Sequence, residues 1–174
     1  MDLVLLVLRV VVGLLFVGHG TQKLFGWFGG HGLAGTGGFF ESLGLRPGRV
    51  HAFAGGLGEA GGGLLLALGL LTPIGAAAII GVMTVAIIVV HLSKGVWVTN
   101  GGFEYNLVLM SVAFALAGVG PGSWSLDNAL GIDWASTGWA LIALGAGVLG
   151  GLLAIAQGRL ASSHAQDHTP AATA

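Results

Sequence analysis

Cysteine is absent from this chain of 174 residues. Its absence excludes disulfide bonds, thiolate catalysis, Cys-ligated zinc and iron–sulfur clusters. We also expect no covalently attached cofactor. Any redox chemistry would therefore depend on a bound cofactor, on a metal held by histidine and carboxylate side chains, or on a partner protein.

Charged residues are scarce as well. They make up 7% of the chain, whereas a soluble domain carries about 25%. Six Lys and Arg and seven Asp and Glu cannot cover a water-facing surface, and the mean hydropathy is +0.92. The solvent of this protein is therefore expected to be the lipid bilayer. The sequence contains neither a basic tract nor a Gly-rich phosphate-binding loop, so we expect no nucleic-acid partner.

Long apolar runs dominate what is present. A helix needs about 20 apolar residues to cross a bilayer, and these runs lack the alternation of barrel strands. The first run lacks a basic start and a cleavage site and contains Arg9, which favours a retained span over a secretory signal. The sequence predicts an all-α membrane protein, a four-helix transmembrane bundle plus a fifth C-terminal transmembrane helix, with spans at 3–20, 50–71, 74–92, 103–119 and 137–156.

The chain divides into three parts. Residues 1–127 hold the four-helix membrane domain and residues 128–158 hold the extra helix. Residues 159–174 form a small, polar tail that we expect to be disordered. The connection from 26 to 48 is too polar and too rich in glycine to span, and its FFESLGL stretch favours a short interfacial helix.

Two kinds of sequence feature predict how the spans pack. Thr72-Pro73 predicts a tight turn, which makes the second and third spans antiparallel neighbours. Small residues four apart let two helix backbones approach closely. The pairs of this kind that we expect at helix contacts are Gly58 with Gly62 and Gly147 with Gly151.

Basic residues concentrate on one side of the predicted bundle. Acidic residues mark the other side. By the positive-inside rule, this distribution places the N-terminus outside and the C-terminus in the cytoplasm. The basic residues in question are Lys23, Arg46, Arg49, Lys94 and Arg159.

Four helix ends bring polar residues together. Consecutive spans alternate in direction, so the end of the first, the start of the second, the end of the third and the start of the fourth share one membrane face. Titratable or amide side chains occur at or near each of these ends. We therefore predict a polar intramembrane pocket whose ligand-binding or proton-relay candidates are His19, Gln22, Lys23, Glu59, His91, Glu104, Tyr105 and Asn106.

Arg9 and Glu59 are charges deep in the predicted membrane core. The apolar residues of the first span outweigh the insertion cost of Arg9, about 2.5–3.5 kcal/mol, but the charge must still face protein or water. An arginine side chain can close the axial gap to Glu59, about 8 Å. We therefore predict an intramembrane ion pair between Arg9 and Glu59. Helical spacing also predicts one inward face made of Arg9, Gly13, Phe16, Gly20 and Lys23.

Each polar residue also has a purely structural interpretation. Solvation at the interface explains Lys23, Lys94 and Glu104. A hydrogen bond to a backbone carbonyl explains His19 or His91. The convergence of these residues at one face of the membrane is more informative than any one of them.

Four stretches carry a resemblance to a known family. They are LLVLRVVVGLLFVGHGTQKLFGWFGGHGLAG, GGLGEAGGGLLLALGLLTP, VHL followed by Gly-Val-Trp, and GGFEYNLVLM. With these motifs the chain resembles the DoxX family of bacterial membrane proteins over residues 3–127. The resemblance implies a four-helix unit in the bacterial cytoplasmic (inner) membrane, from which the fifth span departs. It also implies a relationship to a subunit of thiosulfate:quinone oxidoreductase and to membrane complexes for quinone or thiol stress.

The first functional hypothesis is a quinone-like ligand bound within an oxidoreductase or stress-response complex. The chain would act with a soluble redox partner and not alone, because it has no evident flavin or haem site. An apolar ring would lie against aromatic side chains, and the polar candidates would bind its oxygens. The predicted pocket aromatics are Phe16, Phe25, Trp27 and Phe28. A metal version of the hypothesis uses His19, Glu59, His91 and Glu104, although no pair among them has the spacing of a recognised metal motif.

The second hypothesis is a non-catalytic membrane scaffold or anchor. In this interpretation the basic face around Arg46 and Arg49 recruits a soluble enzyme, and the polar cluster only stabilises helix packing. A small transporter is a further alternative, but the sequence has no clear inverted repeat and such a small bundle would have to form a homo-oligomer.

Overall fold

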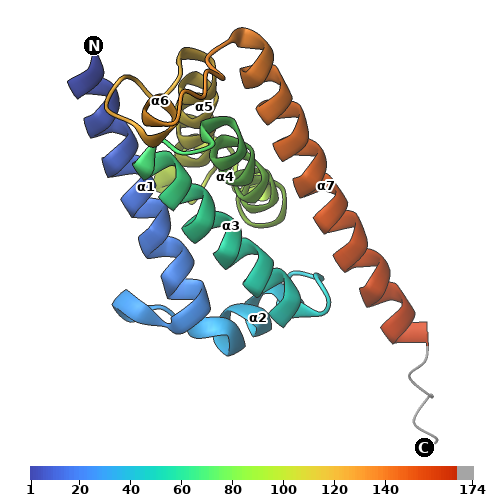
Figure 1. Cartoon of the computed structure of the whole chain (residues 1–174). Helices are drawn as coiled ribbons and strands as arrows, with labels where there is room; N and C mark the ends of the chain where they lie inside the picture. Colours follow the sequence, from blue (N-terminus) through green and yellow to red (C-terminus); the bar gives the residue numbers. More distant parts are fainter. Residues whose placement is uncertain (168–174) are drawn as a thin grey trace, which may run out of the picture.

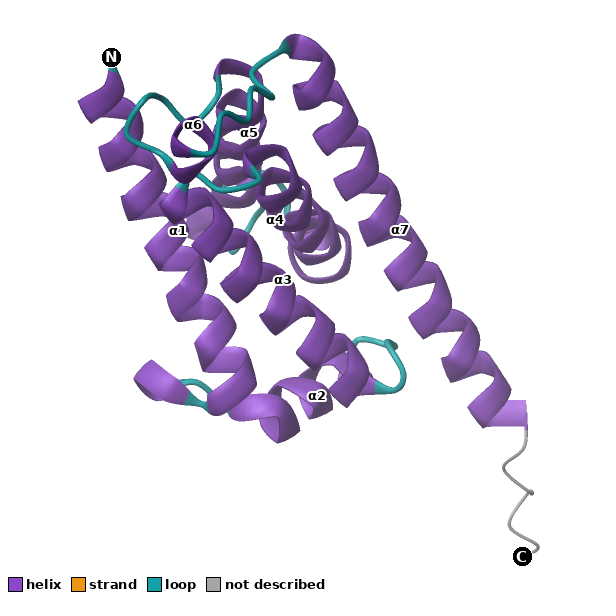
Figure 2. Ribbon diagram, in the orientation of Figure 1, coloured by secondary structure: helices purple, strands orange, loops and turns teal. Residues whose placement is uncertain are grey.

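Helices form the whole secondary structure of residues 1–167, the part of the chain that the computed structural model describes (Figure 2). The predicted all-helical class is confirmed for these residues. The α-helices are α1 (Asp2–Phe25), α2 (Gly32–Ser42), α3 (Gly48–Leu68), α4 (Thr72–Ala86), α5 (Glu104–Val119), α6 (Leu126–Ala129) and α7 (Thr137–Asp167). Single turns of other helix types are η1 (Trp27–Gly29), η2 (Ile87–His91), η3 (Leu92–Lys94) and η4 (Val98–Asn100), of which η2 is a π-helix.

The long helices form one bundle with α4 at its centre. Helices α1 and α3 lie side by side, α7 forms the opposite edge, and α4 and α5 lie between them (Figure 1). Helix α2 crosses the end of the bundle where α1 ends and α3 begins. The core consists of aliphatic residues and Phe16, and includes Leu66, Ile79, Ile80 and Leu116.

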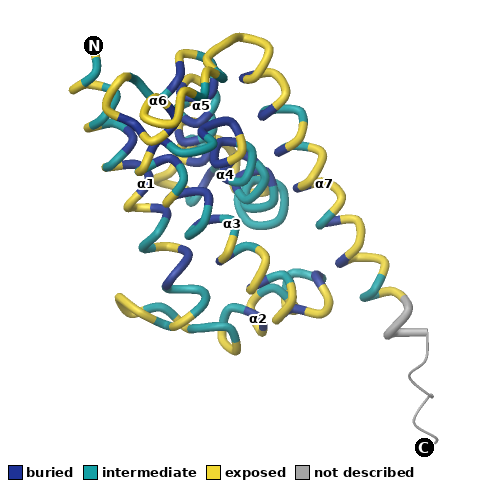
Figure 3. The backbone as a smooth tube through the Cα atoms, viewed as in Figure 1, coloured by how far each residue is buried: buried dark blue, intermediate teal, exposed yellow. Residues whose placement is uncertain are grey.

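Many residues on the outside of the bundle are exposed (Figure 3), and a large number of these exposed residues are apolar. Leu3, Val7, Val11 and Leu14 are exposed along one face of α1, and Leu149 is exposed on α7. Leucine and valine at regular helical spacing facing outward are typical of contact with lipid.

Three helical segments are long and apolar enough to cross a membrane: Asp2–Phe25, Thr72–Lys94 and Thr137–Ser163. Helix α5 is apolar but has 16 residues, which span about 24 Å at 1.5 Å per residue. Helix α3 carries Arg49, Glu59 and many glycines, which lower its hydropathy. The structure therefore supports a helical membrane protein, and the count of four spans plus one stays a prediction.

Glycines bring α1 and α3 into backbone contact. A Cβ atom added at Gly63 would lie 2.5 Å from the carbonyl oxygen of Gly13, and one added at Gly20 would lie 2.5 Å from that of Gly56. No side chain fits between the helices at these points. The predicted inward face of α1 is confirmed for Arg9, Gly13, Phe16 and Gly20, which are buried, whereas Lys23 at its end is partly buried.

Glycines on α3 and α7 contact α4 in the same way. Gly58 and Gly62 lie against the α4 residues Val82 and Ala78, and Gly147 and Gly151 lie against the carbonyl oxygens of Ala77 and Gly81. Both predicted small-residue pairs therefore mark helix contacts. The contact along α4 joins the fifth predicted span closely to the rest of the bundle.

The turn between α3 and α4 is tight, as predicted. Gly69 and Leu71 adopt positive φ angles of 61° and 46°, and Pro73 occupies the first turn of α4. The carboxylate of Asp127 accepts hydrogen bonds from the amides of Leu71 (2.7 Å) and Thr72 (3.1 Å) and from the Thr72 hydroxyl (2.7 Å). Helix α6, which follows α5 in the chain, thus holds the start of α4.

Two predicted boundaries need correction. The interfacial helix expected at FFESLGL begins earlier, at Gly32, and ends at Ser42. The disordered tail expected from residue 159 is wrong for residues 159–167, because α7 continues to Asp167. The small and polar residues there include Ala and Gln, which propagate a helix that has already begun. The rest of the predicted tail, 168–174, lies outside the described residues.

Candidate functional site

A cavity of about 450 Å³ lies between α2, α3, α4 and α7. Its walls are mostly Ala, Gly, Val and Phe side chains, which makes the interior largely apolar. Phe39 and Phe40 come from α2, and Ala146, Gly150 and Ala154 come from α7. The polar and charged residues that line the cavity are Lys23, Thr36, His51, Glu59 and His91.

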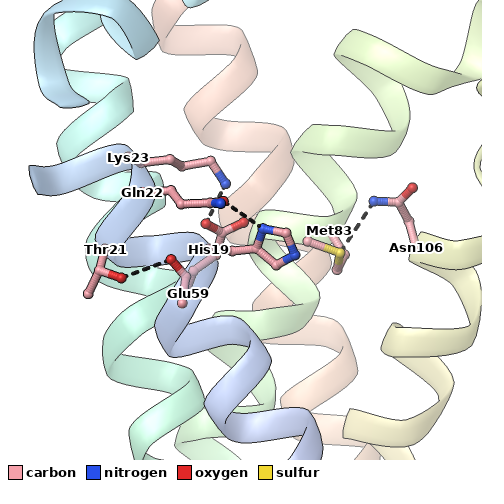
Figure 4. A network of polar contacts seen from close by, with 8 residues as sticks. His19, Thr21, Gln22, Lys23, Glu59, Met83 and Asn106 are labelled. Carbon is pink, nitrogen blue, oxygen red and sulfur yellow. Dashed lines mark hydrogen bonds and ion pairs between the residues drawn. The ribbon is translucent and has the colours of Figure 1, made fainter. Parts of the chain in front are cut away.

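Lys23 and Glu59 form an ion pair at the wall of this cavity. The Lys23 ammonium donates to Glu59 Oε2, and Figure 4 shows the two side chains pointing toward each other from α1 and α3. The Glu59 side chain is 4% exposed and that of Lys23 is 27% exposed. A carboxylate so withdrawn from solvent requires a charged partner.

The predicted ion pair between Arg9 and Glu59 is wrong. Gly13 faces Gly63 and Gly20 faces Gly56, so Arg9 is level with Ala67, about 12 Å along α3 from Glu59. Side chains on a helix also slant toward its N-terminus. In this antiparallel pair the slant moves Arg9 and Glu59 apart, whereas it moves Lys23 and Glu59 together.

Arg9 instead ties together backbone at the opposite end of the bundle. Its guanidinium donates to the carbonyl oxygens of Ala67 (3.0 Å) and Trp124. Arg9 is 1% exposed. It therefore joins α1, α3 and the loop that contains Trp124, and it does not line the cavity.

His91 is the last residue of the π-helix η2, which continues α4, and it lines the cavity. Its Nδ1 lies 2.7 Å from the carbonyl oxygen of Gly101. A carbonyl oxygen only accepts hydrogen bonds, so Nδ1 carries the proton and donates. In a neutral imidazole this leaves Nε2 as an acceptor.

His19 and Gln22 do not line the cavity. His19 Nδ1 lies 3.1 Å from Gln22 Oε1 (Figure 4). Gln22 Nε2 donates to the carbonyl oxygen of Phe28 at 3.2 Å. Phe28 has a φ angle of 51°, a left-handed conformation that is strained for a bulky residue. These two candidates hold the loop after α1 in place.

The three candidates at the start of α5 also lie away from the cavity. Glu104 Oε1 accepts a hydrogen bond from the amide of Val98 at 3.0 Å. Asn106 is buried and its Nδ2 donates to the sulfur of Met83 at 3.3 Å (Figure 4). Tyr105 is 49% exposed. The predicted convergence therefore holds for Lys23, Glu59 and His91, and their role in binding stays a prediction.

None of the four predicted pocket aromatics lines the cavity. Phe16 is 2% exposed and belongs to the hydrophobic core. Phe25, Trp27 and Phe28 are 62%, 57% and 77% exposed, and their rings contact one another. The loop after α1 turns these rings outward, and the aromatic wall comes from α2.

The four residues of the metal alternative do not come together. Among the side chains that the structure describes, those of residues 1–163, no three of His, Cys, Asp or Glu lie close enough to hold a metal ion. Each of the four side chains has a different partner instead of a shared site. The pairs are His19 with Gln22, Glu59 with Lys23, His91 with Gly101, and Glu104 with Val98.

Sequence reasoning missed His51 and the wall supplied by α7. His51, Gly55 and Glu59 are spaced four apart and all line the cavity, a spacing that places residues on one helix face. The same signal was available on α7, where small residues recur at three or four residue steps from Ala146 to Ala154. The stripe on α3 that includes Glu59, or the stripe of small residues on α7, would have indicated the position of the cavity.

Comparison of the sequence with known proteins places this chain in a family. The DoxX family matches residues 4–92. “Putative oxidoreductase CatD” of Bacillus subtilis is 36% identical over 113 residues, which cover 65% of this chain and 78% of that protein. “Inner membrane protein YqjF” of Escherichia coli is 31% identical over 133 residues, covering 76% of this chain and 96% of that protein. No solved structure matches the chain. With half of the chain matched and two such relatives, the protein belongs to the DoxX family of membrane proteins.

Proposed function

We propose that this protein is a subunit of a membrane-associated oxidoreductase or stress-response complex and that its cavity binds a quinone-like molecule. One observation carries the proposal: an apolar cavity of about 450 Å³ contains a buried carboxylate–ammonium pair and a histidine. Small-molecule sites usually measure about 300–1,000 Å³ and combine apolar walls with a few polar groups.

The walls suit a flat ring with an apolar substituent. Phe39 and Phe40 offer aromatic faces on one side, and the Ala and Gly residues of α7 leave room on the other. A ring molecule soluble in lipid reaches such a site from the bilayer. Quinones have this combination of a planar polar head and apolar substituents.

The polar groups suit oxygen atoms on that ring. Lys23 and Glu59 present a charged pair, and His51 and His91 present imidazoles. Such groups form hydrogen bonds to ring oxygens and hold or release protons near them. Electron transfer itself would come from a soluble redox partner, in keeping with a relative named an oxidoreductase.

The membrane arrangement belongs to the same proposal. We place α1, α3, α4, α5 and α7 across a bacterial inner membrane, with the N-terminus outside and the C-terminus in the cytoplasm. A relative named an inner membrane protein supports this location. The exposed Arg46, Arg49 and Arg159 support the orientation by the positive-inside rule.

Binding of menadione to the detergent-purified protein tests the proposal. Equilibrium dialysis against matched empty micelles is expected to show saturable binding of one menadione per chain, and a short-chain ubiquinone is expected to compete. If neither molecule binds above the micelle background, the cavity is not a quinone site and the proposal is wrong.

A second candidate function, a membrane anchor for a soluble enzyme, has its own supporting observation. The backbone amide of Arg46 donates to the carbonyl oxygen of Gly158 at 3.1 Å, so the connection before α3 adjoins the cytoplasmic end that we propose for α7. Arg46, Arg49 and Arg159 are exposed there. For an anchor, Arg46→Glu with Arg49→Glu would abolish recruitment of the soluble partner, whereas filling the cavity would leave recruitment unchanged.

A further inference from the structure

We propose that the cavity prefers the reduced, hydroxyl form of its ring ligand, a quinol or a phenol, and that the ligand O–H group donates to Nε2 of His91. This inference rests on the proposed function and names the chemical class that the site selects. It concerns binding alone and requires no electron transfer. Three features of the structure support it.

The first feature is the π-helix Ile87–His91, which directs His91 into the cavity. The residues of α4 and η2 that line the cavity come in adjacent pairs, Ala77–Ala78, Gly81–Val82, Val85–Ala86 and Val90–His91. The steps between pairs are four, four and five residues, and the step of five falls on the π-helix. A regular α-helical step of four residues from Val85–Ala86 would present Val89 and Val90 to the cavity. The step of five presents Val90 and His91, so His91 takes the place of Val89. Such π-turns are frequent at functional sites.

The second feature is the hydrogen bond from His91 Nδ1 to the carbonyl oxygen of Gly101, at 2.7 Å. In the neutral imidazole it places the proton on Nδ1 and leaves Nε2 as an acceptor. An acceptor pairs with a ligand O–H and not with a ligand C=O. A quinone ring carbonyl would find no donor at this atom.

The loop that carries Gly101 is itself held in place. The amide of Gly102 donates to the carbonyl oxygen of Trp97 at 2.9 Å, and Glu104 Oε1 accepts from the amide of Val98 at 3.0 Å. Gly101 has a φ angle of 78°, which favours glycine. Glu104 is therefore a positioning residue, which acts on the ligand through the loop, Gly101 and the His91 tautomer.

The third feature is the balance of donors and acceptors among the other lining groups. Glu59 offers only acceptor oxygens, whereas the Lys23 ammonium has three N–H donors, one of which is directed at Glu59 Oε2. Thr36 and His51 can each donate or accept, so they favour neither form of the ligand. Lys23 can thus serve either form of the ligand, while Glu59 and His91 Nε2 are acceptors that only a ligand O–H can satisfy.

Three probes of the same ring system test the inference: menadiol, menadione and 1,4-dimethoxy-2-methylnaphthalene. Only menadiol carries O–H groups. Under anaerobic conditions, dialysis against matched micelles is expected to show menadiol binding at least about tenfold more tightly than the other two, the difference made by one good hydrogen bond. His91→Phe is expected to abolish this preference, and His91→Gln to retain part of it, because the Gln side-chain oxygen accepts hydrogen bonds.

Two controls separate a binding role from a structural one. His31→Phe makes the same change at an exposed histidine outside the cavity, and is expected to keep the preference. Val89→His with His91→Val moves the imidazole to the position that a regular α-helical turn would direct into the cavity, and is expected to lose the preference.

If the wild type binds all three probes equally, or if His91→Phe keeps the preference for menadiol, the inference is overturned while the quinone site stands. If no probe binds, the proposed function fails and this inference fails with it.

Discussion

The ammonium of Lys23 on α1 is paired with the carboxylate of Glu59 on α3, and this carboxylate side chain is 4% exposed. The pair exists because antiparallel helices slant these two side chains toward each other. Its consequence for stability is asymmetric. Removing one charge leaves the other buried, whereas removing both leaves an apolar contact.

Lys23→Met is therefore expected to destabilise the protein by about 3–5 kcal/mol, because Glu59 keeps a buried charge without a partner. The double variant Lys23→Met with Glu59→Leu is expected to recover most of this loss and to bind menadiol poorly. Thermal unfolding in detergent measures the stability. Lys94→Met, at an exposed lysine, is the control, and equal unfolding temperatures for Lys23→Met and Lys94→Met would contradict the assignment.

Gly63→Ala is expected to loosen the α1–α3 contact. The new Cβ would lie 2.5 Å from the Gly13 carbonyl oxygen and 2.7 Å from Phe16 Cβ, and such overpacking costs about 1–3 kcal/mol. Gly61→Ala on the same helix meets no atom within 4 Å, so it should gain the helix propensity of alanine, about 1 kcal/mol. Opposite shifts in unfolding temperature are the expected result, and shifts of the same sign would show that the helices do not pack at Gly63.

Asp127→Ala is expected to free the start of α4. The carboxylate of Asp127 accepts from two amides and one hydroxyl, at 2.7–3.1 Å, and loss of such charged hydrogen bonds costs about 1.5–3 kcal/mol each when the donors stay buried. Hydrogen exchange at the Leu71 and Thr72 amides should accelerate, while the amides of α7 keep their protection. Asp133→Ala, at an exposed aspartate, should leave exchange at both amides unchanged.

Gly150→Leu is expected to block the cavity without unfolding the protein. Gly150 lines the cavity, and a Cβ atom added there meets nothing within 4 Å. The leucine side chain would occupy the space that we assign to the ligand, and menadione affinity should fall by at least about tenfold. Gly145→Leu on the same helix has equal room but faces away from the cavity. Equal menadione binding by the two variants would exclude this cavity as the site.

Periodicity predicted which face of each helix is buried. Gly13, Phe16 and Gly20 are inward because the apolar and small residues of α1 repeat at helical spacing. The same reasoning located the α4 contacts of Gly62 and Gly147. These properties depend on local spacing, which a sequence displays directly.

Pairing across helices was harder to predict. Estimated depth in the membrane suggested Arg9 as the partner of Glu59. The glycine contacts between α1 and α3 fix the relative position of the two helices, and the slant of the side chains then brings Lys23 and not Arg9 to Glu59. The conformation of the loop after α1 was also hard to predict. Phe25 and Trp27 come directly after the polar residues at the end of α1, but the backbone at Phe28 is left-handed, and all three aromatic rings are exposed.

The small residues of α7 form one wall of the cavity, and the ion pair of α1 and α3 forms another. Residues 4–92, which match the family, include the charged wall and exclude α7. All the charged and histidine residues that line the cavity lie within the matched segment, whereas α7, outside it, contributes only small apolar residues to the wall. Substitutions along a single peripheral helix can remodel which molecules fit, while the chemistry offered to them stays the same.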